Sequence, residues 1–247
     1  MGRSPEGRMT VKTGARTALL VATATRALAV AKLFDMHGHI SVREGDVTYV
    51  NGHSASRVAV TPEAVAIVRI ADGTTFEGTP PSEIPIHLLL YRTRPDVGAI
   101  VHFHALYATS LSVAGKPLVT AFNAGAPFGR EVPVFDDPRL VRSEDQGRRL
   151  AAVVGRGPAA LLRGHGAVVV AADLPSAVAL ALQLEESAHR LWLTYAIGEP
   201  RRFTDDELAS VGGQLAEPRI VRKIWIDAIE RARRAGALDG LDFESVV

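Results

Sequence analysis

The sequence predicts an α/β or α+β fold in which helices cover a central sheet. Three observations lead to this prediction: short β-branched runs alternate with longer helical patterns, Gly and Pro separate these elements at close intervals, and no repeat or low-complexity linker divides the chain. With 247 residues, of which 47% are hydrophobic and 22% charged, the chain has enough apolar material for one large core. We therefore expect a flexible N-terminus over residues 1–14 and a single domain over residues 15–247.

The first expected element is an amphipathic helix over residues 15–34. Its apolar residues recur at helical spacing, while Arg16, Arg26 and Lys32 interrupt the stretch. These charges argue against a secretory signal, and no apolar run reaches the roughly 18 residues that a membrane-spanning helix needs. We expect a cytoplasmic protein that does not contact membranes.

Strands and a helix follow in the first half of the chain. Apolar and β-branched runs predict strands over residues 39–43, 46–50, 66–70 and 99–103. Between the last two strands, a Gly/Pro break at residues 78–81 precedes a helix that Ser82 would cap and that extends to about Arg92.

Helices dominate the remainder. We expect strands over residues 131–135, 159–162 and 167–170, and helices over residues 105–112, 144–154, 174–196, 207–215 and 221–235. The long helix over 174–196 contains good helix formers and is ended by Gly198 and Pro200.

Composition excludes several kinds of site. The chain has no cysteine, which rules out disulfides, thiolate zinc sites, iron–sulfur clusters and a cysteine nucleophile. The formal charge of +1 lacks the excess of Lys and Arg that is typical of nucleic-acid-binding proteins, so we expect no nucleic-acid partner. Any transition metal must be bound by Asp, Glu or the eight histidines.

His102 and His104 give the strongest chemical signal. Residues two apart in a strand face the same side, so both imidazoles can serve one site as ligands for zinc, manganese, iron or cobalt. A surface pair on an exposed strand is the alternative.

His165 and Glu83 extend this signal. His165 stands between Gly164 and Gly166 after a predicted strand, where it is either a third metal ligand or an ordinary turn histidine. Glu83 stands at a predicted helix start, where the helix dipole alone favours a carboxylate, although a metal ligand or general acid/base fits equally. His87 lies on the same helical face and either binds metal or packs beneath the site.

Further candidates lie on the first predicted strand and in the turn after the second. His39, Ser41 and Arg43 share one side of the strand, where they either bind a carboxylate or phosphate or form a solvated face. His53 lies in Asn51-Gly52-His53-Ser54. The first interpretation of this segment is a hairpin turn, and the second is a contact with substrate.

Together these pieces resemble the class II aldolase/adducin family. The matches are residues 38–43 to the pattern G-N-x-S-x-R, Pro81-Ser82-Glu83 before a helix, Arg94-Pro95-Asp96 through His102-Phe103-His104, and Gly164-His165-Gly166. They occur in the family's order and cover roughly residues 20–200.

The resemblance implies a three-layer αβα fold around a mostly antiparallel central sheet. It implies one divalent metal per subunit, held by His102, His104 and His165, with zinc first and manganese, iron or cobalt as alternatives. Glu83 would be the acid/base and would ligate the metal when substrate is absent, and Ser82 would contact substrate. The resemblance also implies a homo-oligomer, specifically a tetramer.

Two departures from the family pattern direct the functional hypothesis. His39 replaces the Asn of sugar-phosphate aldolases, and Asn51-Gly52-His53-Ser54 replaces the T-P-x-G segment that helps to hold phosphate. Imidazoles near Arg43 suit a carboxylate or phenolic oxygen on a small anionic substrate. We therefore expect a metal-dependent decarboxylase of a hydroxylated aromatic or heteroaromatic carboxylic acid, acting through a metal-stabilised enolate or phenolate. The alternatives are a class II aldolase acting on a hydroxy-carbonyl or sugar-phosphate substrate, and a non-enzymatic adducin-like interaction module.

Overall fold

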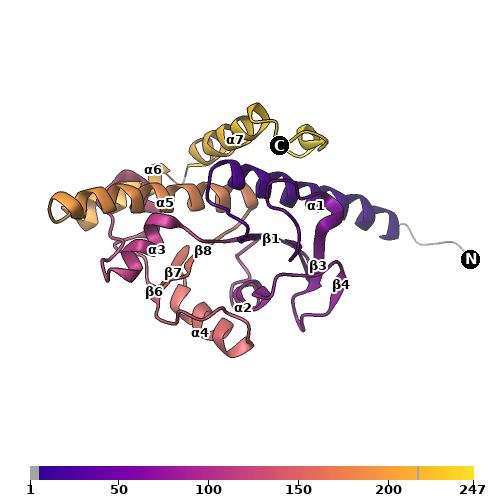
Figure 1. The fold of residues 1–247 in the computed structure, drawn as a ribbon, viewed down its shortest axis with the longest axis horizontal. Helices are drawn as coiled ribbons and strands as arrows, with labels where there is room; N and C mark the ends of the chain where they lie inside the picture. The colour runs from indigo at the N-terminus through magenta and orange to yellow at the C-terminus, as the bar shows by residue number, and fades with distance from the viewer. Residues whose placement is uncertain (1–5, 216) are drawn as a thin grey trace, which may run out of the picture.

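An eight-stranded sheet lies between two layers of helices in the computed structural model, which describes residues 6–215 and 217–247 (Figure 1). The strands are β1 (His39–Glu44), β2 (Val47–Asn51), β3 (Val65–Arg69), β4 (Thr75–Glu77), β5 (Ala99–Phe103), β6 (Val134–Phe135), β7 (Ala159–Leu162) and β8 (Gly166–Ala171). Their order is β4-β3-β2-β1-β5-β8-β7-β6, and neighbouring strands are antiparallel except β6 and β7. The expected αβα fold with a mostly antiparallel sheet is confirmed.

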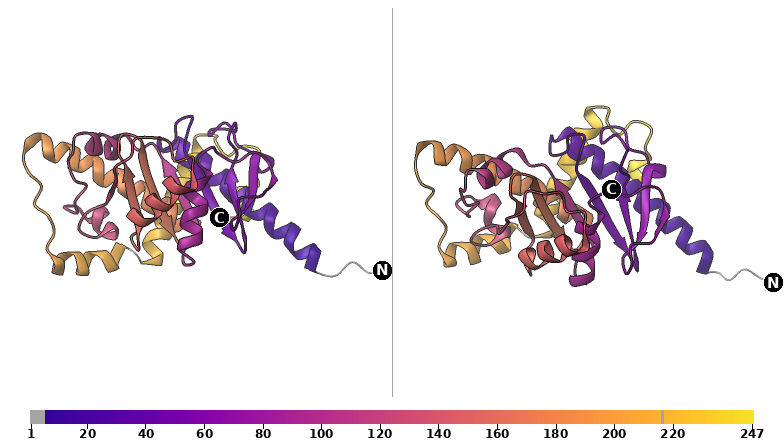
Figure 2. Two further views of the ribbon diagram at one scale, coloured as in Figure 1. Left: turned by 90° about the horizontal axis from the view of Figure 1, so that it is seen from below. Right: turned by 60° about the horizontal axis from the view of Figure 1, so that its bottom comes forward.

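Helices cover both faces of this sheet. One face packs against α1 (Glu6–Val30), α3 (Leu106–Val113) and α5 (Leu174–Ile197), and the other against α2 (Ile84–Thr93) and α4 (Glu144–Val154) (Figure 2). Helix α7 (Pro218–Arg234) packs outside α1 and α5, while α6 (Asp205–Leu215) contacts the short helix η2 (Asn123–Phe128). Two further short helices are η1 (Pro62–Ala64) and η3 (Phe243–Ser245).

Strand β5 is buried on both faces. Val101 and Phe103 belong to the core beneath α1 and α5, whereas Ile100 belongs to the core beneath α2 and α4. A strand with two buried faces needs apolar residues at nearly every position, which explains the continuous apolar run of its sequence. His102 interrupts this run on the α2 side.

Helix α1 differs from its prediction at both ends. It begins at Glu6 and so overlaps the segment 1–14 that was expected to be flexible. Residues 1–5 lie outside the described residues, and the flexibility of this segment stays a prediction. The helix ends at Val30 because Lys32 adopts a left-handed backbone conformation (φ 61°), which cannot continue a right-handed helix.

Other element boundaries also differ. Helix α2 begins at Ile84 with Glu83 at its N-cap position, so the prediction that Ser82 caps this helix is wrong. Strand β4 was not expected, because its three residues are all exposed and show no buried face. The predicted strand over residues 131–135 is reduced to β6, because Glu131 forms only an isolated bridge to Val119.

Among the described residues, no helix combines the length and the apolar character needed to cross a membrane.

Leu184 on α5 tests the importance of the core beneath α1 and α5. Its side chain is fully buried, so Leu184→Ala should lower the free energy of unfolding by about 2–5 kcal/mol, through lost burial and the cavity left behind. Leu193→Ala on the same helix removes a side chain that is 50% exposed, and should change the free energy of unfolding by less than about 0.5 kcal/mol. Urea denaturation measures both; equal losses would contradict this assignment of the core.

Candidate metal centre

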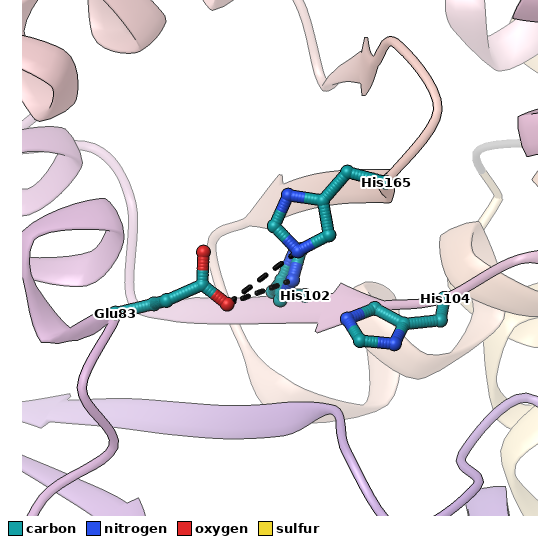
Figure 3. Close-up of side chains that lie close together, drawn as sticks. All are labelled: Glu83, His102, His104 and His165. Carbon is teal, nitrogen blue, oxygen red and sulfur yellow. Dashed lines mark ion pairs between the residues drawn. The ribbon is translucent and has the colours of Figure 1, made fainter. Parts of the chain in front are cut away.

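Four side chains from three parts of the fold converge at the end of the central strand β5 (Figure 3). Glu83 precedes α2, His102 lies on β5, His104 follows β5 directly, and His165 lies in the turn between β7 and β8. One ligand atom from each lies within 4.8 Å of the ligand atoms of the other three. The structure thus brings together all four residues that the sequence analysis expected around a metal.

Local geometry explains this convergence. His102 and His104 lie two residues apart, so the strand period directs both toward the same side, while Phe103 enters the opposite core. The β7–β8 turn lies against the end of β5: a Cβ atom on Gly166 would be 2.3 Å from the carbonyl oxygen of Phe103. Only glycine allows this approach, which places His165 beside the two β5 histidines.

Glu83 is a buried carboxylate among imidazoles. Its Oε2 lies 3.8 Å from His102 Nε2 and 3.5 Å from His165 Nε2, and its Oε1 accepts a 2.8 Å hydrogen bond from the Val141 amide. Burial by itself would raise the pKa of Glu83, but the contact with His165, the charge interaction with His102 and the Val141 amide outweigh it and lower the pKa to about 2. The carboxylate is therefore ionised at neutral pH.

The histidines are suited to bind a cation. Burial lowers the pKa of both His102 and His104, so they are held in the neutral form that a metal requires. The Nδ1 of His102 lies 3.0 Å from the Ala167 carbonyl, to which it donates, leaving the Nε2 lone pair directed at Glu83 and His165.

Unsatisfied nitrogen atoms support the same conclusion. His102 Nε2 and both ring nitrogens of His165 are buried and have no hydrogen-bond partner within the described part of the chain. Buried polar atoms without partners are costly, and a metal ion would satisfy His102 Nε2 and one of the two nitrogens of His165. Three imidazoles and one carboxylate fit zinc, and they also fit manganese, iron or cobalt.

A cavity of about 70 Å³ adjoins this cluster. It is lined by the predicted substrate-binding residues His39, His53 and Ser82, by Glu83 and His104, and by Arg57. His53 and Ser82 are exposed, whereas His39 is 4% exposed. The cavity therefore joins the metal ligands to groups that can bind an anion.

Ser41 and Arg43 do not line this cavity, and their contact with a substrate stays a prediction. Arg43 donates hydrogen bonds to the main-chain carbonyls of Tyr91 and Pro95 at the end of α2, and its guanidinium lies 4.6 Å from the centre of the Tyr91 ring. Strand alternation predicted the side of the sheet on which Ser41 and Arg43 lie, but not their distance from the cavity. Each step of two residues moves roughly 6.6–6.8 Å along a strand, so both lie farther from the cavity than His39.

Arg57 was not identified from the sequence. It is 5% exposed, and its guanidinium donates from Nε to the Gly38 carbonyl (2.7 Å) and from Nη1 to the carbonyls of Gly52 and Ala55. None of the described residues accepts a hydrogen bond from its Nη2. A single arginine in a loop of small and polar residues carries no sequence pattern that marks it as a pocket residue.

His87 is fully buried and lies outside the group of metal ligands. It contacts His39 and Ser41 instead, so it packs beneath the site.

Comparisons with known proteins agree with this geometry. The family described as "Class II Aldolase and Adducin N-terminal domain" matches residues 20–192. A 5-methylthioribulose-1-phosphate/5-deoxyribulose-1-phosphate aldolase of Rhodospirillum rubrum is 30% identical over 70% of this chain and 79% of its own. A 3,4-dihydroxyphthalate decarboxylase of Arthrobacter keyseri is 31% identical over 80% of this chain and 86% of its own. The solved L-fuculose 1-phosphate aldolase from Glaciozyma antarctica PI12 shares the fold, with a TM-score of 0.78 at 22% identity over 90% of each chain.

Replacement of a ligand tests the metal centre. His102→Ala should weaken zinc binding by more than about 100-fold, because it removes a buried nitrogen from the cluster, whereas His189→Ala on α5 should leave zinc binding unchanged. Zinc content after dialysis and calorimetric titration of the metal-free proteins measure the difference. Equal zinc affinity in the two variants would contradict the assignment.

Proposed function

The chain belongs to the class II aldolase and adducin family, and we propose that within it the chain is a divalent-metal-dependent carbon–carbon lyase that decarboxylates a hydroxylated aromatic or heteroaromatic carboxylic acid. The observation that carries the proposal is the convergence of Glu83 with three imidazoles, two of which, His102 and His165, have buried nitrogens without a partner among the described residues. An adducin-like module with no chemistry would gain nothing from such a costly arrangement. We further propose zinc as the metal and a homotetramer as the assembly, as the resemblance implies.

The reaction needs negative charge to be stabilised and one proton to be moved. When bound, a divalent metal supplies Lewis-acid stabilisation of the charge that develops on a substrate oxygen. Glu83 is ionised, so it can take the proton of the substrate hydroxyl at its Oε2. After the carbon–carbon bond breaks and carbon dioxide leaves, the electron pair stays on the ring carbon, and Glu83 returns the same proton there.

The relatives include both aldolases and decarboxylases and do not favour either reaction. The loop after β2 supports decarboxylation. A phosphate group is usually held by several free backbone N–H groups. Here the amides of Gly52 and His53 donate within the protein, to the carbonyls of Ala64 and Thr79 at 2.9 Å each, and the Ala55 amide donates to Gly52.

The cavity is also lined by side-chain donors. His39, His53, Arg57 and Ser82 can hold the one or two oxygens of a carboxylate or phenolic group. Cleavage of a hydroxy-carbonyl or sugar-phosphate substrate remains the second candidate function, because aldolases are among the relatives and would use the same metal ligands.

Carbon dioxide release from ortho-hydroxylated aromatic carboxylates tests the reaction. Zinc-loaded protein should release it, and chelator-treated protein should not. Glu83→Gln should retain zinc better than His102→Ala yet turn over at least about 100-fold more slowly, because it cannot carry the proton. Folded, zinc-loaded protein that releases no carbon dioxide but forms an aldehyde from a sugar phosphate would replace the decarboxylase with the aldolase.

Arg57 provides a test of substrate charge. Arg57→Gln should raise KM about tenfold or more for an ortho-hydroxylated aromatic carboxylate, because a charge-assisted hydrogen bond to its carboxylate or phenolic oxygen is lost. Arg26→Gln is the matched control and should change KM little, since Arg26 is also buried and donates to four main-chain carbonyls, but does not line the cavity. Steady-state kinetics and melting temperatures of both variants check this, and equal rises of KM in the two variants would reject the role of Arg57.

A further inference from the structure

A chain of buried polar groups leads from the cavity into the layer beneath it. His39 Nδ1 lies 2.6 Å from His87 Nε2, His87 Nδ1 lies 2.6 Å from Ser41 Oγ, and Ser41 Oγ lies 2.8 Å from Tyr91 Oη. These residues are between 0% and 4% exposed, and they connect β1 to α2. Of the four, only His39 lines the cavity.

Both imidazoles in this chain are neutral. His87 is fully buried and His39 is 4% exposed, and burial favours the uncharged form of an imidazole. A neutral imidazole has one N–H and one lone pair, so the short contact between the two rings requires the N–H of one and the lone pair of the other. The protons of the two imidazoles can therefore be arranged in only two consistent ways, which run in opposite directions.

Glu83 distinguishes the two directions. Its Oε2 lies 4.0 Å from His39 Nε2, and an ionised carboxylate only accepts hydrogen bonds. If His39 Nδ1 carried the proton, the Nε2 lone pair would face this negative charge. The favourable direction places the proton on Nε2, so that His39 Nδ1 accepts from His87, His87 Nδ1 accepts from Ser41, and Ser41 Oγ accepts from Tyr91.

We propose that this chain holds His39 as a neutral hydrogen-bond donor, whose Nε2–H points into the cavity and donates to a substrate oxygen. His87, Ser41 and Tyr91 are positioning residues, since they reach the substrate only through His39. The identity of that oxygen, on a carboxylate or phenolic group, rests on the proposed function, whereas the tautomer does not. A donor held in place before the substrate arrives stabilises developing oxygen charge without rearrangement. Asn, which stands at this position in the family pattern G-N-x-S-x-R, offers an amide N–H of the same kind.

The tautomer can be measured without substrate. In zinc-loaded and metal-free protein labelled with ¹⁵N-histidine, two-bond ¹H–¹⁵N correlations distinguish the two neutral forms, and the spectrum of His39→Asn identifies the signals of His39. We expect the Nε2–H form of His39 and the Nε2–H form of His87. An Nδ1–H form of His39, or a protonated ring at pH 7, would overturn the proposal.

Variants test the positioning chain. Ser41→Ala removes the donor to His87, so His39 should populate both tautomers and kcat/KM should fall about tenfold. His39→Phe should lose about 100-fold, and His39→Asn should recover a large part of that loss because it keeps an N–H donor. Thr25→Val is the control, since it also removes a fully buried hydroxyl, one that bonds only to the Val21 carbonyl on α1.

The outcomes separate this proposal from the proposed function. A single His39 tautomer that persists in Ser41→Ala would remove the positioning role, whatever reaction the protein performs. A protein with the Nε2–H form of His39 but no lyase activity on any carboxylate or aldol substrate would refute the proposed function and leave the hydrogen-bonded chain in place.

Discussion

The burial of imidazole nitrogens without partners, next to an ionised carboxylate, is the constraint on which the rest of this structure depends. His102 Nε2 and His165 Nε2 approach Glu83 at the end of a central strand that is buried on both faces. Leaving such atoms unsatisfied costs stability, of order 1–3 kcal/mol for each group, so the surrounding core has to compensate. The two apolar clusters on either side of β5 provide that compensation and hold the ligands in place.

The pairing of β1 with β5 places two histidines with different roles side by side, His39 on β1 and His102 on β5. His39 and His102 are opposite each other in the register, and their ring centres are 4.8 Å apart. His102 donates from Nδ1 to a main-chain carbonyl, which exposes a lone pair at Nε2, whereas the buried chain beneath His39, together with the Glu83 carboxylate near its Nε2, favours a proton at Nε2. Two identical side chains side by side thereby become an acceptor for a cation and a donor for an anion, because the partners of their Nδ1 atoms differ.

The convergence of the four residues could be predicted from the sequence, because local rules suggested each of them and the family resemblance joined them into one set. Strand alternation placed His102 and His104 on one side, and the glycines around His165 indicated a turn at a strand end. What the sequence did not predict depends on tertiary distance. Ser41 and Arg43 share a side with His39 but lie farther along β1, where α2 covers them. Arg57 lines the cavity because its loop folds back to Gly38, a contact that no periodicity encodes.

The charges around the cavity favour substrate over product in the proposed decarboxylation. A bound divalent ion, the Glu83 carboxylate and the Arg57 guanidinium together would place a net charge of +2 beside a small cavity. A hydroxylated carboxylate brings the opposite charge in its acid group and, once its proton has moved to Glu83, in its phenolic oxygen. Loss of carbon dioxide removes the acid group, and return of the proton from Glu83 to the ring carbon leaves a phenolate with one negative charge. A second proton, taken up from solvent on the phenolic oxygen, gives a neutral phenol, which the site attracts less than it attracts the substrate anion. An aldol cleavage that leaves a phosphate on one fragment would retain its charge in the site, where the amides of Gly52, His53 and Ala55 already donate within the protein.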